Sequence, residues 1–222
     1  MADYVVTEAG FGAEMGAEKM MHIKAAARGN APDCVVMNVT VRSMKMHGGG
    51  FSTGGGKRPR PEEIAKENVD AVRAGAATNM ARHIRNMARF GVPVIASVNV
   101  FPTDTDAEIQ ALVDEAREAG ATDAVVTRVH SNGGEGGADL ARAVVSACQT
   151  HIAEGRPFEP LFGPNAPLEE KILRIATNVY GAASIDLAPK ALNELKTLQN
   201  WGYGNLCLLY KNPSPRDLST SS

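Results

Sequence analysis

The sequence has 222 residues, of which 44% are hydrophobic and only 5% are aromatic. This length suits one α/β domain or slightly more, with a core that must pack mainly through aliphatic side chains. The formal net charge of −2 gives no sign of nucleic-acid binding, and the one basic run, at residues 57–60, is short enough to be a solvated loop.

Cysteine usage and the apolar runs indicate a compartment. Cys34, Cys148 and Cys207 form no CxxC pair, so we expect buried free thiols in a reducing environment. No apolar run approaches the length of a membrane span, and no signal core follows Met1. We therefore expect a soluble, cytoplasmic protein without membrane contact; a mitochondrial location stays open.

Strands and helices are expected to alternate in the first part of the chain. Short β-prone or apolar runs predict strands at residues 4–7, 34–41, 94–100 and 124–129, and the second run is typical of a strand covered on both faces. Periodic apolar positions predict helices at residues 16–24, 62–90, 106–119 and 138–150. Thr105 and Glu108 form a capping box at the start of the third helix, and Gly75 weakens the second by about 1 kcal/mol.

Past residue 155 the chain becomes rich in proline, which marks a linker or a long connection. Two helices at residues 167–180 and 189–200 begin at prolines and are followed by Gly181 and Gly202, and a short strand is expected at residues 205–210. The predicted organisation is an α/β core over residues 1–154, a helical extension with a short strand over residues 155–211, and a flexible tail over residues 212–222.

Strands separated by helices of this length predict an α/β fold with a mostly parallel sheet flanked by helices. Ligands of open parallel sheets bind beyond the carboxyl ends of the strands. All four predicted strands lead into clusters of glycine and polar residues, at residues 8–12, 45–50, 99–104 and 130–134. Glycine there lets backbone amides approach an anion closely, so we expect a ligand site on this edge.

Individual residues of the clusters suggest roles. Glu8 resembles the acidic position that helps to hold Mg²⁺ in nucleoside-triphosphate enzymes, and an acid favoured by a helix N-terminus is the equal alternative. Lys45 and His47 suit contact with phosphate or carboxylate, or are an ordinary exposed lysine and a capping histidine. Phe101 can stack on a flat heterocycle. Asp104, five residues after Asn99, is either part of a base-recognition loop or a helix cap.

Several catalytic patterns are absent from the sequence. It has no metal-ligand cluster and no nucleophile–base arrangement, and Ser131 lacks a GxSxG elbow. It also has no GxxxxGK[ST] motif; residues 54–57 come closest without the spacing. The sequence therefore contains no recognised cradle for a triphosphate.

At the same clusters the sequence resembles the formate–tetrahydrofolate ligase (10-formyltetrahydrofolate synthetase) family. The motifs that carry the resemblance are TEAGFGAEMGAEK at residues 7–19, TVRSMKMHGG at 40–49, FGVPV at 90–94, NVFPTDTDAE at 99–108, GGEGG at 133–137 and GYGNL at 202–206. The resemblance implies a P-loop NTPase-like core, here incomplete because the family's phosphate loop lies upstream of Met1. It also implies an ATP-dependent C–N ligase of one-carbon metabolism, which forms formyl phosphate from formate and MgATP and transfers the formyl group to N10 of tetrahydrofolate.

Matched position by position, the resemblance assigns roles to the clusters. Phe101 and Pro102 match an aromatic–proline wall of the pterin and nucleotide site, and His130 stands where the family usually has tryptophan. Residues 8–12 match the loop that faces formyl phosphate. The predicted catalytic set is Glu8, Lys45 and His47; the predicted substrate-binding set is Gly10, Phe11, Gly12, Asn99, Phe101, Pro102, Asp104, His130, Gly133 and Gly134; no residue is assigned to a metal.

The expected ligands are ATP, Mg²⁺, tetrahydrofolate and formate, with no nucleic acid. A homo-oligomer or a complementing chain is an expected partner, because open sheet edges favour association. The alternative is a catalytically incomplete fragment or paralogue that binds folate, nucleotide or a partner chain without turnover.

Overall fold

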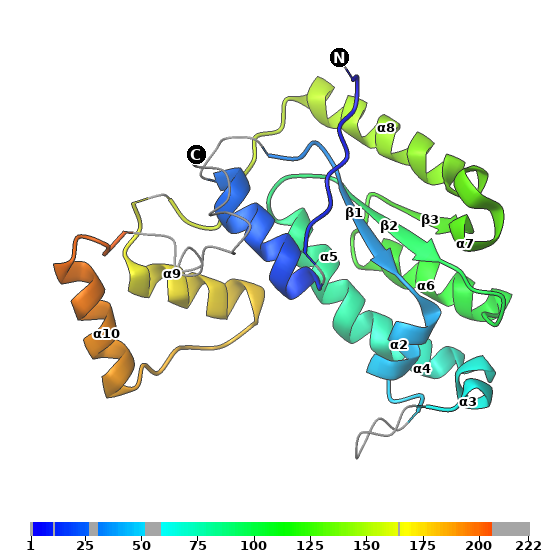
Figure 1. Cartoon of the computed structure of the whole chain (residues 1–222), viewed down its shortest axis with the longest axis horizontal. Helices are drawn as coiled ribbons and strands as arrows, with labels where there is room; N and C mark the ends of the chain where they lie inside the picture. The colour runs from blue at the N-terminus through cyan, green and yellow to red at the C-terminus, as the bar shows by residue number, and fades with distance from the viewer. Residues whose placement is uncertain (1, 11, 27–30, 52–58, 164, 206–222) are drawn as a thin grey trace, which may run out of the picture. The chain divides into compact units, whose positions relative to one another are not determined.

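The computed structural model describes residues 2–10, 12–26, 31–51, 59–163 and 165–205. Contacts divide the chain into two compact units (Figure 1): one is Pro32–Glu159, and the other combines Met1–Ala31 with Pro160–Ser222. The first 31 residues thus group with the C-terminal part, whereas the sequence pattern placed them in a core of residues 1–154. The predicted strand at residues 205–210, the tail and Cys207 lie outside the described residues, apart from Asn205, which is not in a strand.

The unit Pro32–Glu159 is built on a three-stranded parallel sheet. β1 (Val35–Val39), β2 (Val94–Asn99) and β3 (Asp123–Thr127) lie in the order β1-β2-β3, with Val36 opposite Ile95 and Ile95 opposite Asp123. The predicted α/β class with a mostly parallel sheet is confirmed. Residues 94–98 of the central strand are all buried, so helices cover both of its faces.

One predicted strand is absent from the described residues, and the expected burial of another is wrong. Residues 2–10 contain no strand, and Val5 and Val6 are exposed, since a β-prone run forms no strand until its backbone pairs with a neighbour. β1 is not covered on both faces: Val36 is 45% exposed and Asn38 is exposed, while Val39 is buried. An apolar run therefore did not imply two-sided burial here.

Seven α-helices are described in this unit. They are α2 (Val41–His47), α3 (Pro61–Ala65), α4 (Val69–Gly75), α5 (Ala81–Ala88), α6 (Asp106–Glu118), α7 (Val129–Asn132) and α8 (Ala138–Glu154). α4 and α5 form one rod through the π-helical turn Ala76–Met80, and its stripe, which includes Val72, Ile84 and Met87, is buried as predicted. The predicted helix at residues 62–90 breaks before α4, because the Asn68 side chain accepts a hydrogen bond from the Ala71 amide and caps that helix.

Glycines let α2 and α4 pack in close contact. A Cβ at Gly48 would lie 1.8 Å from the Ala71 carbonyl oxygen, and one at Gly75 would lie 2.0 Å from the Met44 carbonyl oxygen. Gly75 was expected only to weaken its helix. The structure shows that it permits a backbone approach that any side chain would block.

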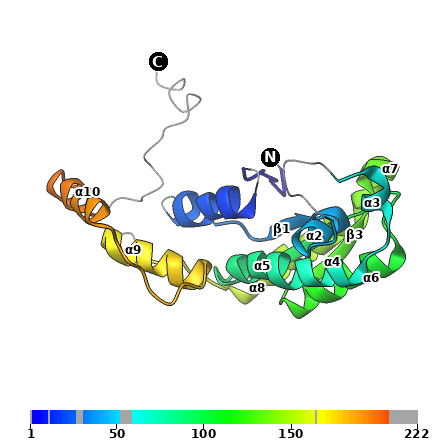
Figure 2. The same ribbon diagram turned by 90° about the horizontal axis from the view of Figure 1, so that it is seen from below.

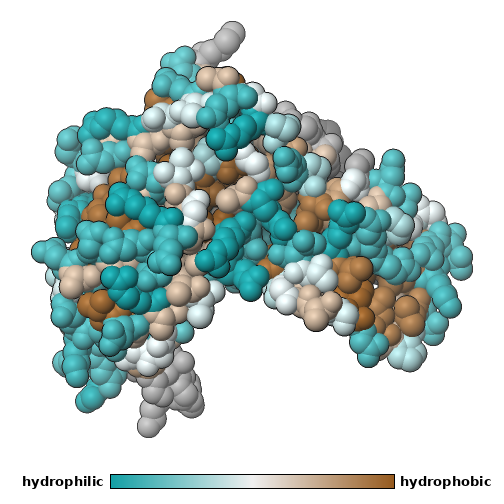
Figure 3. All heavy atoms as spheres, turned by 180° about the vertical axis from the view of Figure 1, so that it is seen from behind, coloured by the Kyte–Doolittle hydropathy of each residue, from teal (hydrophilic) through white to brown (hydrophobic). Residues whose placement is uncertain are grey.

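In the other unit, all the regular secondary structure among the described residues is helical. It contains the π-helical segments Ala13–Ala17 and Met20–Ala25, α9 (Leu168–Arg174) with its π-helical continuation Ile175–Val179, and α10 (Pro189–Asn200), so the helices predicted at residues 16–24, 167–180 and 189–200 are confirmed. Figure 2 shows α9 and α10 as separate rods. Figure 3 shows hydrophobic side chains on the surface of this region. Leu173, Leu192 and Trp201 are among the large apolar residues of this unit that are exposed.

Inside this unit, the buried polar side chains Glu18 and His22 each contact an aromatic residue. The Tyr180 hydroxyl donates to the Glu18 carboxylate at 3.1 Å, and His22 stacks on Phe162 with ring centroids 5.7 Å apart. Burial raises the pKa of Glu18, and the hydrogen bond from Tyr180 opposes that rise only in part. Among the described residues, no helix combines the length and apolar character needed to cross a membrane.

Candidate functional site

The carboxyl edge of the sheet carries an aromatic and cationic cluster, here called the Phe101 cluster and made of Arg42, Phe101 and His130. Each member follows a different strand: Arg42 lies in α2 after β1, Phe101 follows β2, and His130 lies in α7 after β3. The Phe101 and His130 ring centroids are 5.7 Å apart with the ring planes tilted by 44°, and Arg42 Cζ lies 5.5 Å from the Phe101 centroid. The parallel strands thus bring together two predicted site residues and a cation that the sequence pattern did not single out.

Charge and exposure make the Phe101 cluster accessible to a ligand. Phe101 is half-buried, whereas Arg42 and His130 are exposed. A guanidinium within about 6 Å of a ring centroid is attracted to the face of that ring. The cluster therefore offers an aromatic surface next to a positive charge, which suits a flat heterocycle that carries an anionic group.

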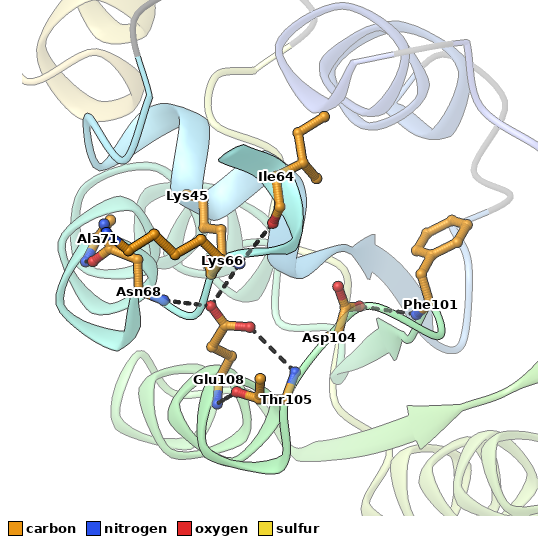
Figure 4. Close-up of polar contacts among 9 residues, drawn as sticks. All are labelled: Lys45, Ile64, Lys66, Asn68, Ala71, Phe101, Asp104, Thr105 and Glu108. Carbon is orange, nitrogen blue, oxygen red and sulfur yellow. Dashed lines mark hydrogen bonds and ion pairs between the residues drawn. The ribbon is translucent and has the colours of Figure 1, made fainter. Parts of the chain in front are cut away.

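The segment that bears Phe101 is held by a reciprocal clamp with Asp104. The Phe101 amide donates to Asp104 Oδ2 at 2.8 Å, and the Asp104 amide donates to the Phe101 carbonyl oxygen at 3.0 Å (Figure 4). Burial raises the pKa of Asp104, and the Phe101 amide opposes this in part. Pro102, inside the clamped turn, is exposed.

Glu108, predicted only as part of a capping box, is a fully buried junction. The box is confirmed: the Glu108 amide donates to Thr105 Oγ1 at 3.3 Å, and the Thr105 amide donates to Glu108 Oε2 at 3.2 Å. Glu108 Oε1 also accepts from the Asn68 amide at 2.7 Å and from Lys45 Nζ at 2.6 Å (Figure 4). Burial raises the pKa of Glu108, but the hydrogen bonds from Lys45 and the two amides outweigh it, so the pKa lies below its ordinary value.

Lys45, predicted to contact a ligand, lies inside the protein. Its side chain is 1% exposed, and Nζ contacts Glu108 Oε1 and donates to the carbonyl oxygens of Ile64 and Lys66, both at 2.9 Å. An ammonium group has three protons to donate, and these three acceptors use all of them. In this structure Lys45 is part of the internal framework and presents no free proton to a ligand.

The other predicted site residues of this unit are spread along the edge. His47 is exposed at the end of α2, and Asn99 is half-buried at the end of β2, paired in register with Thr127. Gly133 and Gly134 are exposed in the 3₁₀ turn Gly133–Gly137 that precedes α8. Among the described residues, no hydrogen bond, ion pair or ring contact joins these positions to the Phe101 cluster.

Gly136, which was not among the predicted site residues, shapes the turn before α8. A Cβ at Gly136 would lie 2.5 Å from the carbonyl oxygen of Arg128, and the Arg128 amide donates to the Gly136 carbonyl oxygen at 3.0 Å. This close contact ties the end of β3 to the turn and holds the short helix with His130 between them. The GGEGG motif predicts a turn in the sequence, but it does not reveal that Gly136 is the glycine in close contact.

Residues 8–12 belong to the other unit. Glu8 and Gly10 are exposed, Gly12 is half-buried, and Phe11 lies outside the described residues. In the part of the chain that the structure describes, no three His, Cys, Asp or Glu side chains are grouped so that they could hold a metal ion.

Together these features define an α/β protein with an open parallel sheet and an aromatic, cationic cluster at its carboxyl edge. The chain belongs to the formate–tetrahydrofolate ligase family, whose model matches residues 1–213. It is 44% identical to the formate–tetrahydrofolate ligase of Desulforamulus reducens over 93% of its length, and 45% identical to that of Roseiflexus castenholzii over 92%. The cytoplasmic C-1-tetrahydrofolate synthase of Schizosaccharomyces pombe is 44% identical over 92% of the chain.

The matches cover only part of each relative. The chain spans 35% of the two bacterial ligases and 21% of the fission-yeast protein. Family membership is therefore a property of this chain, whereas the activity belongs to much longer relatives.

Proposed function

We propose that this chain serves the ATP-dependent formylation of tetrahydrofolate, in which formate is activated as formyl phosphate and its formyl group passes to N10 of tetrahydrofolate. The Phe101 cluster carries the proposal, because it places an aromatic face and a cation at the edge of a parallel sheet where ligands bind. Membership in the formate–tetrahydrofolate ligase family supports it. The work would be done in the cytoplasm.

In this proposal Phe101 and Pro102 form one wall for the pterin or the nucleotide base, with His130 as the second ring. Arg42 attracts the anionic part of the same ligand, while Asp104 holds the Phe101 turn. Asn99, Gly133 and Gly134 line the same edge. For Glu8, Gly10 and Gly12, which belong to the other unit, only the family resemblance supports a role toward the formyl phosphate.

Lys45 and His47 take different parts. His47 is exposed and free to meet a phosphate or carboxylate, whereas Lys45 acts through the groups that it holds. Mg²⁺ usually keeps several waters and binds through substrate phosphates with one or two carboxylates. By that general behaviour, we propose that Mg²⁺ binds together with the ATP phosphates.

The direct test is a steady-state assay of the 222-residue chain with MgATP, formate and tetrahydrofolate. Product that disappears in Phe101→Ala supports the proposal, and a matched change at an exposed aromatic elsewhere, Tyr203→Ala, serves as the control. Absence of 10-formyltetrahydrofolate at high enzyme concentration would rule out activity of this chain alone.

A second function, binding of folate or nucleotide without turnover, is favoured by one observation: the 222 residues contain no GxxxxGK[ST] loop. Phosphoryl transfer depends on such positioned amides and a lysine. Titration calorimetry with tetrahydrofolate and with MgATP separates the two functions. Folate binding with no ATP binding and no product supports the second, and mixing with a chain that supplies the loop should then restore turnover.

A further inference from the structure

A buried ion pair lies directly behind the Phe101 turn and touches no solvent. The side chains of Lys45 and Glu108 are 1% and 0% exposed, and Nζ and Oε1 are 2.6 Å apart. Burying two charges is costly unless both are fully paired and hydrogen-bonded. This pair meets that condition, so its geometry is strictly defined.

The lysine side of the pair joins two segments. Lys45 comes from α2 and directly follows Met44, whose carbonyl oxygen lies in the close contact with Gly75 of α4. Its ammonium group donates to the carbonyl oxygens of Ile64 and Lys66. The Lys45 carbonyl oxygen also accepts from the Gly50 amide at 2.7 Å. The KMHGG segment and the α3–α4 connection are thereby fixed to one point.

The glutamate side continues from that point to the ligand edge. Glu108 Oε1 pairs with Lys45 Nζ and accepts a hydrogen bond from the Asn68 amide, and Oε2 accepts one from the Thr105 amide. Thr105 directly follows Asp104, whose carboxylate and amide clamp Phe101. Figure 4 shows the contacts running from Lys45 through Glu108 to Thr105, beside the Asp104–Phe101 clamp.

We propose that Lys45 and Glu108 are positioning residues, which fix the Phe101 turn so that the ring stays at the ligand edge although neither charge touches a ligand. The KMHGG lysine then acts from inside the protein and not as a phosphate contact. The ligand part of this inference rests on the proposed function. The positioning part does not.

Amide hydrogen exchange tests positioning without any ligand. In Glu108→Gln the neutral amide holds Lys45 and Thr105 less firmly, so the Phe101 and Asp104 amides should exchange about tenfold faster or more, as expected for local opening. The β2 amides of Ile95 and Val98 serve as an internal reference for the whole unit, and Glu118→Gln, exposed at the end of the same helix, is the matched control.

Equal acceleration of the β2 and Phe101 amides, or no acceleration of the Phe101 amide, would overturn the inference. If Glu108→Gln does not fold, Glu108→Asp replaces it, because a shorter carboxylate keeps the charge but cannot reach Lys45 and Thr105 together. The same comparison with the β2 amides then decides.

Calorimetry with tetrahydrofolate tests the link to the ligand. Glu108→Gln and Phe101→Ala should each weaken binding about tenfold, and the double variant should be no weaker than the worse single variant, since both act through one ring. If the fold losses of tetrahydrofolate affinity multiply in the double variant, Glu108 does not act through Phe101. A wild-type chain that binds no tetrahydrofolate defeats the proposed function, while the exchange result still decides whether the pair positions Phe101.

Discussion

Replacing Lys45 with methionine should lower the free energy of unfolding, because it leaves the buried Glu108 carboxylate without its cationic partner. Methionine fills similar space without charge and leaves the Glu108 carboxylate, which is 0% exposed, without its counter-ion. Removing one partner of a buried pair typically costs about 3–5 kcal/mol. Glu108 keeps the Asn68 and Thr105 amides as donors, so we expect the lower end, about 3 kcal/mol.

The orphaned carbonyl groups add little to this cost. Ile64 is half-buried and Lys66 is exposed, so we expect water to replace Lys45 Nζ at their carbonyl oxygens in the variant. The matched control is Lys66→Met, the same substitution at an exposed side chain of the same unit. It should change the free energy of unfolding by no more than about 0.5 kcal/mol.

The cost of Lys45→Met should also depend on pH. In the wild type the pKa of Glu108 lies below its ordinary value, so its contribution to stability is complete above that ordinary value and is lost as pH falls through the folded-state pKa. Without Lys45, burial dominates and raises the pKa, and protonation then relieves the buried charge. The difference between variant and wild type should therefore be larger at about pH 7 than at about pH 4.5.

Urea unfolding followed by far-ultraviolet circular dichroism at both pH values measures these differences. A cost below about 1 kcal/mol at neutral pH would mean that the pair is not a buried, paired charge in solution. A cost that is the same at both pH values would refute the assignment of the loss to the Glu108 carboxylate.

Three further outcomes are expected. Phe101→Ala should weaken the binding of tetrahydrofolate by about 1–3 kcal/mol in calorimetry, by analogy with base–aromatic stacking, and unchanged affinity would count against a stacking role. Gly75→Ala should destabilise the chain by about 1–3 kcal/mol in urea unfolding, because its Cβ would lie 2.0 Å from the Met44 carbonyl oxygen, whereas Gly134→Ala, with no atom within 4 Å, should be nearly neutral. Burial, with the nearby Cys148, raises the pKa of Cys34 to about 12, so this thiol should react with iodoacetamide at pH 8 far more slowly than free cysteine; equal rates would contradict its burial.

Much of the fold could be predicted because its signals are local. The apolar stripe of the α4–α5 rod has helical spacing, the Thr105 capping box starts α6, and Gly91 with Pro93 ends one element before β2. The predictions were wrong where the structure of a segment depends on the segments that pack against it. A strand at residues 4–7 needs a pairing partner, and the open face of β1 depends on which elements cover it.

The contacts of the candidate site also differ in whether the sequence could predict them. Phe101 and His130 could be expected to meet, since the carboxyl ends of parallel strands share an edge. The burial of Lys45 could not, because two of its three acceptors are backbone carbonyl oxygens, which every residue carries and no side-chain pattern reveals. Glu108 was recognised by one contact, with Thr105, that is visible in the sequence, and its contact with Asn68 was not.

Phe101 and His130 differ in how firmly the protein holds them. This difference matters because His130 stands where the family usually has tryptophan. The ring centroids are 5.7 Å apart and the ring planes are tilted by 44°, so we expect a flat ligand to enter between the rings only if one of them turns away. Phe101 is tied through Asp104, Thr105 and Glu108 to a buried charge, while His130 stands exposed on the four-residue helix α7. In the proposed function we therefore expect His130 to move when a flat ligand binds, while Phe101 stays in place.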